Sequence, residues 1–114
     1  MLSNLSNYRS KFVTPDEAAA LAVRSGDWVD YGFGGGFPEL MDKALAKRKD
    51  ELSDIKVRGG LVIRPRIEVV ECDPEQSTFS YYSWHIGDYE RKIFKFNVVT
   101  YKRMCAYRYL RLAA

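Results

Sequence analysis

The chain has 114 residues, which is the size of one domain. With 46% hydrophobic and 29% charged residues, its composition is that of a globular protein and excludes a disordered chain. The longest apolar run, residues 18–23, is far shorter than the roughly 20 residues of a membrane-spanning helix. The first residues lack a signal-peptide pattern, so we expect a cytoplasmic protein that has no membrane partner.

The cysteines and the histidine limit the possible metal and redox chemistry. Cys72 and Cys105 lie far apart outside any C-x-x-C motif, and His85 is the single histidine. This predicts reduced thiols, no disulfide scaffold and no metal site. The acidic neighbours of Cys72 predict a raised pKa for its thiol, which makes it a poor nucleophile.

The charge divides the chain into two parts. Residues 1–101 hold 14 Lys and Arg against 15 Asp and Glu, a net charge of −1, whereas residues 102–114 carry +4. The Arg- and Tyr-rich tail offers one alternative function, nucleic-acid binding by stacking and phosphate contacts. The charge of the body argues against it, and we expect no nucleic-acid partner.

The first predicted helix covers residues 17–24 and has a clear start. Thr14 and Glu17 form a capping box, and Pro15 suits the first helical position. Gly26, which can adopt the left-handed conformation, ends the helix. A short strand is predicted at residues 28–31.

The strand is then expected to end, because four of the five residues 32–36 are glycine and glycine is unfavourable inside a strand. The pattern predicts a helix over residues 38–52 and a strand over residues 55–63. The residues expected on the buried face of that helix are Leu40, Met41, Ala44, Leu45 and Leu52. Those expected on one face of the strand are Ile55, Val57, Leu61 and Ile63.

The second half repeats the alternation of strands and helices. Residues 64–76 are predicted as a loop with a helical turn at 67–70, followed by a strand at 78–83, a helix at 88–95 and a strand at 98–101. Two β-α-β units in succession predict an α/β fold with a mostly parallel sheet and flanking helices.

The glycine-rich loop is the strongest local signal for a binding site. A strand, a glycine turn and a helix start form a general anion cradle. Phe37 stands where a Rossmann glycine is needed, and Phe37-Pro38 replaces the Walker Gly-Lys-Ser/Thr. An anion- or carboxylate-binding loop and a plain turn both remain open.

Other candidates carry weaker signals. His85 follows a strand end, where ligands bind in parallel sheets, although a half-buried structural histidine is the alternative. Asp30 lies beside the glycine loop, with a strand-edge or capping role as its alternative. Arg64 and Arg66 suit a phosphate, or a solvated loop. The carboxylates form no recognisable catalytic pair.

Several motifs occur together along the chain. They are Tyr8-x-x-Lys11-x-x-Thr14-x-Asp16-Glu17, Ser25-Gly26-Asp27-Trp28, Val57-Arg58-Gly59-Gly60, Asp73-Pro74, and Ser83-Trp84-His85 followed by Glu90-Arg91-Lys92. As a set they resemble the N-terminal region of the acetyl-CoA hydrolase/transferase family. The subgroup nearest in pattern is that of the butyryl-CoA:acetate and 4-hydroxybutyrate CoA-transferases, and the resemblance runs from about Tyr8 to Tyr101.

This resemblance implies a fold, a reaction and a set of substrates. The fold would be the N-terminal part of a NagB/RpiA/CoA-transferase-like domain, with the active site between two similar halves. The reaction would transfer CoA from an acyl-CoA to a short-chain carboxylic acid through an acyl-glutamyl anhydride and a glutamyl-CoA thioester, or hydrolyse acetyl-CoA. Coenzyme A thioesters would be substrates, and no cofactor would be tightly bound.

The resemblance also implies where the site lies. Gly34, Gly35, Gly36 and Phe37 would line the acyl or carboxylate side, with Trp84 and His85 near the same cleft. The nucleophilic glutamate of the family belongs to a C-terminal half, so we expect no catalytic residue in this chain.

The family pattern stops near Tyr101, where the charge also changes. We therefore expect a partial domain at residues 1–101 and a foreign basic tail at 102–114, as in a truncated or frameshifted product. Such a chain would be inactive alone and would form a homo-oligomer or need the missing half. The alternative is a non-catalytic module that binds acyl-CoA or a carboxylate through the glycine loop.

Overall fold

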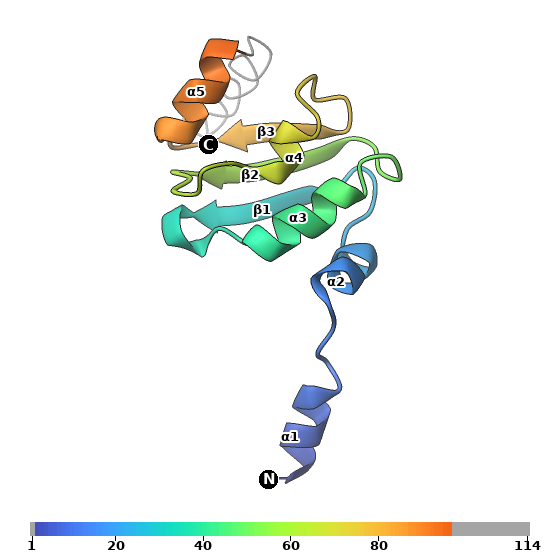
Figure 1. Cartoon of the computed structure of the whole chain (residues 1–114). Helices are drawn as coiled ribbons and strands as arrows, with labels where there is room; N and C mark the ends of the chain where they lie inside the picture. The colour runs from blue at the N-terminus through green and yellow to red at the C-terminus, as the bar shows by residue number, and fades with distance from the viewer. Residues whose placement is uncertain (1, 97–114) are drawn as a thin grey trace, which may run out of the picture.

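The structure is a computed structural model that describes residues 2–96 (Figure 1). The predicted strand at residues 98–101 therefore lies outside the described residues. In chain order the elements are α1 (Leu2–Arg9), α2 (Pro15–Ala22), β1 (Trp28–Phe33), the 3-10 turn η1 (Gly34–Gly36), α3 (Glu39–Lys47), β2 (Ile55–Gly60), α4 (Glu68–Glu71), β3 (Phe79–Ser83) and α5 (Asp88–Phe96). Among these helices, none combines the length and apolar character needed to cross a membrane.

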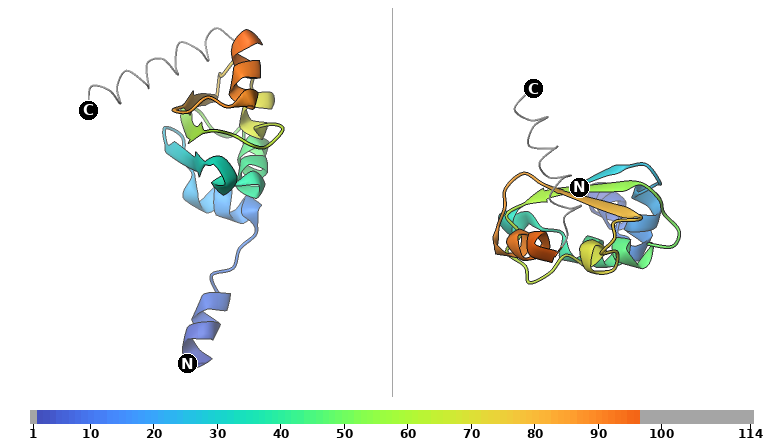
Figure 2. Two further views of the ribbon diagram at one scale, coloured as in Figure 1. Left: turned by 90° about the vertical axis from the view of Figure 1, so that its left-hand side faces the viewer. Right: turned by 90° about the horizontal axis from the view of Figure 1, so that it is seen from above.

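The three strands form a parallel sheet in the order β1-β2-β3. Val57 in the central strand pairs with Val29 on one side and Tyr81 on the other. Seen from above, α3, α4 and α5 lie on the same side of this sheet (Figure 2). The prediction of an α/β fold with a parallel sheet and flanking helices is confirmed.

The core lies between the sheet and these helices. Side chains alternate along β2, so Ile55 and Val57 face inward with no exposed surface while Lys56 and Arg58 remain partly exposed. Tyr81 and Leu45 reach the same core from β3 and α3. Burying each large apolar side chain contributes about 1.5–3 kcal/mol, so this cluster is the main source of stability.

The first predicted helix is present and is capped as expected. The Thr14 hydroxyl accepts from the Glu17 N–H at 3.2 Å, and the Glu17 carboxylate accepts from the Thr14 N–H at 2.8 Å. Gly26 has φ +91°, the left-handed conformation predicted for it. The helix ends at Ala22, earlier than predicted, because the backbone of Val23 is already extended.

Two predicted elements are too long, and their buried faces change accordingly. α3 ends at Lys47 instead of residue 52, and Leu40 is 65% exposed instead of buried. β2 ends at Gly60 because Leu61 has φ +47°, which breaks the extended backbone. The alternation therefore does not continue to Ile63, which is 65% exposed, and Val62 turns into the core instead.

The turn before β3 is held by a buried carboxylate. Asp73 accepts hydrogen bonds from the N–H groups of Ser77, Thr78 and Phe79 at 3.1, 2.7 and 2.9 Å. Burial raises the pKa of Asp73, but these bonds to its charged form outweigh burial and leave the pKa below its ordinary value. The charged carboxylate thus fixes the start of β3.

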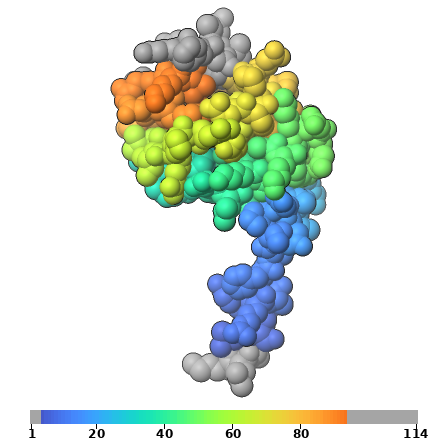
Figure 3. Space-filling model, viewed as in Figure 1, coloured from blue at the N-terminus to red at the C-terminus, as the bar shows by residue number. Residues whose placement is uncertain are grey.

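The sequence pattern does not predict α1, which the structure contains. This helix lies away from the rest of the chain, as the ribbon and space-filling views show (Figures 1 and 3). Tyr8 and Phe12 pack edge to face with ring centroids 5.0 Å apart, yet they are 63% and 67% exposed. The sheet and its helices, and not this segment, therefore hold the site described next.

Candidate functional site

The candidate site lies at the carboxyl ends of the strands, which meet at one edge because the sheet is parallel. β1 runs directly into the glycine turn η1, and β3 runs into a loop at residues 84–87. Phe33, the last residue of β1, pairs with Gly60 of β2, and Ser83, the last of β3, pairs with Gly59. Both segments following the outer strands therefore reach across the end of β2.

Because Gly60 has no side chain, the end of β1 can contact the loop that follows β3. Phe33 and Trp84 have ring centroids 5.0 Å apart, and Phe33 and His85 meet edge to face at 5.4 Å. A Cβ on Gly60 would lie 3.3 Å from a ring carbon of Phe33, the indole nitrogen of Trp84 and the backbone nitrogen of His85. The bare backbone of Gly60 thus forms the floor of an aromatic cluster, consisting of Phe33, Trp84 and His85.

The aromatic cluster is open to solvent. Phe33 is 43% exposed, Trp84 is 38% exposed, and His85 is exposed. His85 therefore lies at the surface, and its role at a binding site stays a prediction. Partly exposed aromatic rings beside a glycine turn provide an apolar surface next to accessible backbone, as ligand sites often do.

The glycine turn has a buried and an exposed side. Gly34 is buried with φ +57°, while Gly35 and Gly36 are exposed. Phe37 is 8% exposed, and its ring packs edge to face on Tyr31 at 5.3 Å. Phe37 therefore anchors the turn in the core, and Gly35 and Gly36 present the backbone to solvent.

The predicted site residues consequently fall into two groups. Gly35, Gly36, Trp84 and His85 are together at the open edge, whereas the buried Gly34 and Phe37 support it. Phe33 completes the cluster, and it was not among the predicted site residues. The clue to it was the Gly59-Gly60 pair in the neighbouring strand, which indicates a close approach of other groups.

The acidic candidates have structural partners. Asp30 accepts from the Gly32 N–H at 2.8 Å and from Arg58 Nε at 2.9 Å. The Gly32 N–H, followed by Arg58, holds the pKa of Asp30 below its ordinary value. This is the capping and strand-edge role that was the alternative for Asp30.

Asp42 is a buried carboxylate that connects α3 to α4. It accepts from the Tyr31 hydroxyl at 3.0 Å and from the N–H groups of Glu68 and Val69 at 2.6 and 3.2 Å. Burial raises its pKa in spite of these bonds. The burial of Asp42 was missed because an i, i+3, i+4 stripe is read from apolar residues alone.

Cys72 has a raised pKa, as predicted, but for a different leading cause. Burial contributes most, and the Asp73 carboxylate adds to it while Lys49 opposes it. The thiol is therefore a poor nucleophile. Among the described residues, no group of His, Cys, Asp and Glu side chains could hold a metal ion.

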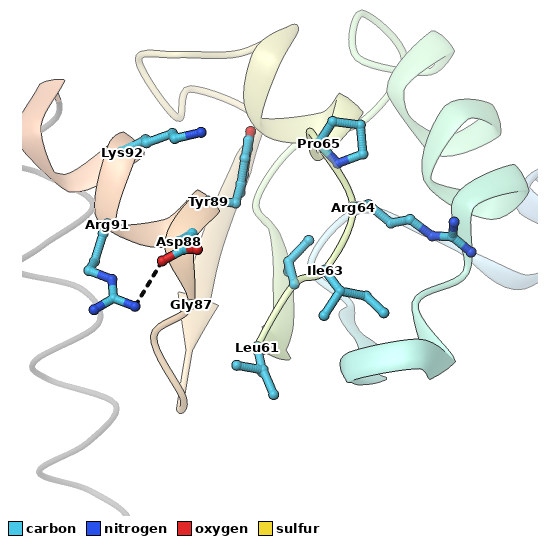
Figure 4. A pocket seen from close by; sticks show the side chains of 10 residues that line it. Leu61, Ile63, Arg64, Pro65, Gly87, Asp88, Tyr89, Arg91 and Lys92 are labelled. Carbon is cyan, nitrogen blue, oxygen red and sulfur yellow. Dashed lines mark hydrogen bonds and ion pairs between the residues drawn. The ribbon is translucent and has the colours of Figure 1, made fainter.

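A cavity of about 530 Å³ opens beside this edge, between the segment that follows β2 and the start of α5 (Figure 4). Arg91 is paired with Asp88 at 2.9 Å, and Arg64 reaches Glu39 at 3.8 Å. Lys92 points towards Tyr89 in the close-up view. Arg66 pairs with Glu68 at 2.8 Å, so neither arginine of the predicted phosphate-binding pair lacks an acidic partner.

Comparison with known proteins gives the family. Residues 3–103 match the model of the acetyl-CoA hydrolase/transferase N-terminal domain. The chain belongs to this family. It is also 46% identical over 94 residues to a probable butyrate:acetyl-CoA coenzyme A-transferase of Syntrophomonas wolfei. A butyryl-CoA:acetate CoA-transferase of Anaerostipes caccae is 44% identical over 94 residues.

In each case the match covers 82% of this chain and 21% of the relative. The chain thus spans about a fifth of the length of these CoA-transferases. Among solved structures, RipA from Yersinia pestis superimposes with a TM-score of 0.63, at 22% identity, over 80% of this chain and 21% of RipA. A RipA mutant gives the same TM-score at 24% identity, over 78% and 20%. These structures share the fold of the chain, which is that of an N-terminal domain of the family.

Proposed function

We propose that the chain is the substrate-lining N-terminal portion of an acyl-CoA:carboxylate CoA-transferase of the butyryl-CoA:acetate type. The observation that carries this is the family match over residues 3–103, which includes both the glycine turn and His85. The names of the relatives support butyryl-CoA and acetate as substrates. A coenzyme A thioester enters as a substrate, and no tightly bound cofactor takes part.

The two parts of the site suit two parts of such a substrate. The exposed backbone of Gly35 and Gly36 lets a carboxylate or thioester oxygen approach N–H groups that a side chain would cover. The aromatic cluster offers apolar surface to a short acyl chain. A butyryl group has two more methylene groups than an acetyl group, and each buried methylene contributes about 0.8 kcal/mol. Butyryl-CoA should therefore bind about tenfold more tightly than acetyl-CoA.

In this proposal the nucleophilic glutamate lies outside the chain. Glu90, the buried glutamate nearest the loop at residues 84–87, accepts two backbone hydrogen bonds and is not placed to attack a thioester. Residues 1–101 act as the partial domain and residues 102–114 as a tail. Turnover then requires the remaining part of the enzyme, and the chain alone is inactive.

The second candidate is a module that binds acyl-CoA or a carboxylate without turnover. The observation that favours it is the same burial of Glu90 beside an otherwise open site. Both candidates predict binding, and they differ in whether a complementary part restores chemistry.

The test has two measurements on the purified chain. Calorimetry with butyryl-CoA measures binding, and conversion of butyryl-CoA and acetate to acetyl-CoA measures exchange, with and without the separately produced remainder of a relative. Binding with exchange that appears only after the remainder is added supports the CoA-transferase proposal. Binding without exchange in both cases supports the module. Absence of binding contradicts both.

A further inference from the structure

Glu90 is a fully buried carboxylate at the start of α5. Its Oε1 accepts from the Val62 N–H at 3.1 Å, and its Oε2 accepts from the Gly87 N–H at 3.0 Å. The Tyr81 and Ser83 hydroxyls lie 3.5 and 3.4 Å from Oε1. Among the side chains that the structure describes, no cation pairs with Glu90, so hydrogen bonds alone compensate its burial.

These bonds join the segments that follow two different strands. Val62 follows β2, and Gly87 closes the loop at residues 84–87 that follows β3. The same two segments are linked directly, because the Leu61 N–H donates to the His85 carbonyl at 2.7 Å. The Ser83 hydroxyl lies 3.0 Å from that carbonyl oxygen. The loop that carries Trp84 and His85 is thus held at both ends.

The local backbone needs this support. Leu61 adopts φ +47°, a left-handed conformation that is unfavourable for a leucine unless its surroundings impose it. At Gly87, an added Cβ would lie 3.0 Å from Glu90 Oε2, so the carboxylate and the loop fit closely. The left-handed Leu61 directly precedes Val62, and Val62 and the glycine at position 87 both donate their backbone N–H groups to Glu90.

We propose that Glu90 is the positioning residue that holds Trp84 and His85 over the end of β2. It acts through the backbone of the loop and does not touch the substrate. The consequence for acyl-CoA rests on the proposed function, because only a substrate at the aromatic cluster would respond to the placement of this loop. The placement itself can be measured without a ligand.

The test variant is Glu90→Gln, with Asp42→Asn as its matched control. Both parent side chains are fully buried carboxylates that accept two backbone N–H groups and lie near a tyrosine hydroxyl. Asp42, however, bonds to Tyr31 of β1 and to the start of α4, and has no hydrogen bond to the loop at residues 84–87. An amide side chain keeps the shape but turns an NH₂ group towards a backbone N–H, which leaves donors unpaired.

Amide hydrogen exchange is the first measurement. In Glu90→Gln we expect exchange about tenfold faster at Leu61 and Gly87, with no change at Ile55, whose N–H bonds to Thr78 in the core. Asp42→Asn should accelerate amide exchange at Val69 and leave amide exchange at Leu61 unchanged. Equal acceleration at all these amides in Glu90→Gln would mean a general stabilising role and would overturn the proposal. If Glu90→Gln does not fold, Glu90→Asp replaces it, because the shorter side chain withdraws the carboxylate from the Val62 and Gly87 N–H groups. Faster exchange at Leu61 and Gly87 is expected, and unchanged exchange at both would overturn the proposal.

Affinity for butyryl-CoA is the second measurement. We expect about tenfold weaker binding by Glu90→Gln and a change of less than about twofold for Asp42→Asn, both measured below their unfolding temperatures. Equal binding by Glu90→Gln and the original chain would overturn the role of Glu90 at the site. Failure of the original chain to bind contradicts the proposed function instead, and hydrogen exchange then decides the proposal about the loop.

Discussion

Replacing Gly60 with alanine would place a methyl group against the aromatic cluster. The new methyl carbon would lie 3.3 Å from Phe33, from the Trp84 indole nitrogen and from the backbone of His85. Carbon contacts are most favourable at about 3.5–4.0 Å, so these three groups must each move by a few tenths of an ångström. Overpacking of this kind costs about 1–3 kcal/mol.

Part of that cost is offset in the unfolded chain. Alanine restricts the unfolded backbone, which favours folding by about 0.4–1 kcal/mol when the native conformation suits it. The net loss should therefore be about 1–2 kcal/mol. For a domain of this size, that corresponds to a fall in Tm of about 5–10 °C.

Thermal unfolding followed by circular dichroism measures this effect, and Gly35→Ala is the matched control. An added Cβ at Gly35 meets no atom within 4 Å, so its Tm should change by about 2 °C or less. The near-ultraviolet signal, to which Trp84 and Trp28 both contribute, should change in Gly60→Ala and not in Gly35→Ala. If Gly60→Ala melts at the temperature of the original chain, the contact of Phe33 with Trp84 and His85 does not exist as described.

Three further substitutions test other parts of the structure. Thr14→Ala removes the capping box shared with Glu17 and should lower stability by about 1 kcal/mol in denaturant unfolding, while Thr14→Ser should restore most of it. Tyr31→Phe removes the buried bond to Asp42 and should cost about 1.5–3 kcal/mol; an unchanged unfolding midpoint would refute that bond. Asp73 has a lowered pKa when folded, so its contribution is complete above the ordinary value of about 3.9 and is lost as pH falls below it. Asp73→Asn should therefore be less stable at pH 7 and show a shallower loss of Tm below about pH 4; parallel Tm profiles of the two proteins would contradict this.

Local signals in the sequence were sufficient for most of the fold. The cap at Thr14, the stop at Gly26 and the alternation of Ile55 with Val57 each depend on neighbours along the chain. They predict elements that the structure contains. Because two β-α-β units imply neighbouring parallel strands, the sheet could be predicted as well.

The element ends could not be predicted in the same way. The left-handed Leu61 ends β2, and its conformation depends on the contact with His85, which is 24 residues away in the sequence. Leu40 satisfies the helical spacing but remains exposed, and the polar Asp42 is buried because backbone N–H groups of α4 reach it. Tertiary hydrogen bonds decide these cases, and the hydrophobic pattern does not contain them.

The candidate site could be predicted only in part, because some of its contacts are made between distant parts of the chain. The glycine turn and the Trp84-His85 segment are adjacent to strand ends and stand out in the sequence. Their meeting depends on Gly60 in the intervening strand, and the part played by Phe33 follows from that contact. The role of Glu90 depends on contacts with Val62, Tyr81, Ser83 and Gly87, which lie in three parts of the chain and share no spacing that would indicate the contact.

The most direct test of the account is to map butyryl-CoA binding residue by residue. Titration of isotopically labelled chain, followed by amide NMR, would locate the ligand. We predict that the largest shifts occur at Gly35, Gly36 and His85, with little change at Gly26, which lies at the amino end of the sheet. Shifts concentrated away from the glycine turn and the aromatic cluster, or no shifts at all, would contradict an acyl-CoA site at this edge.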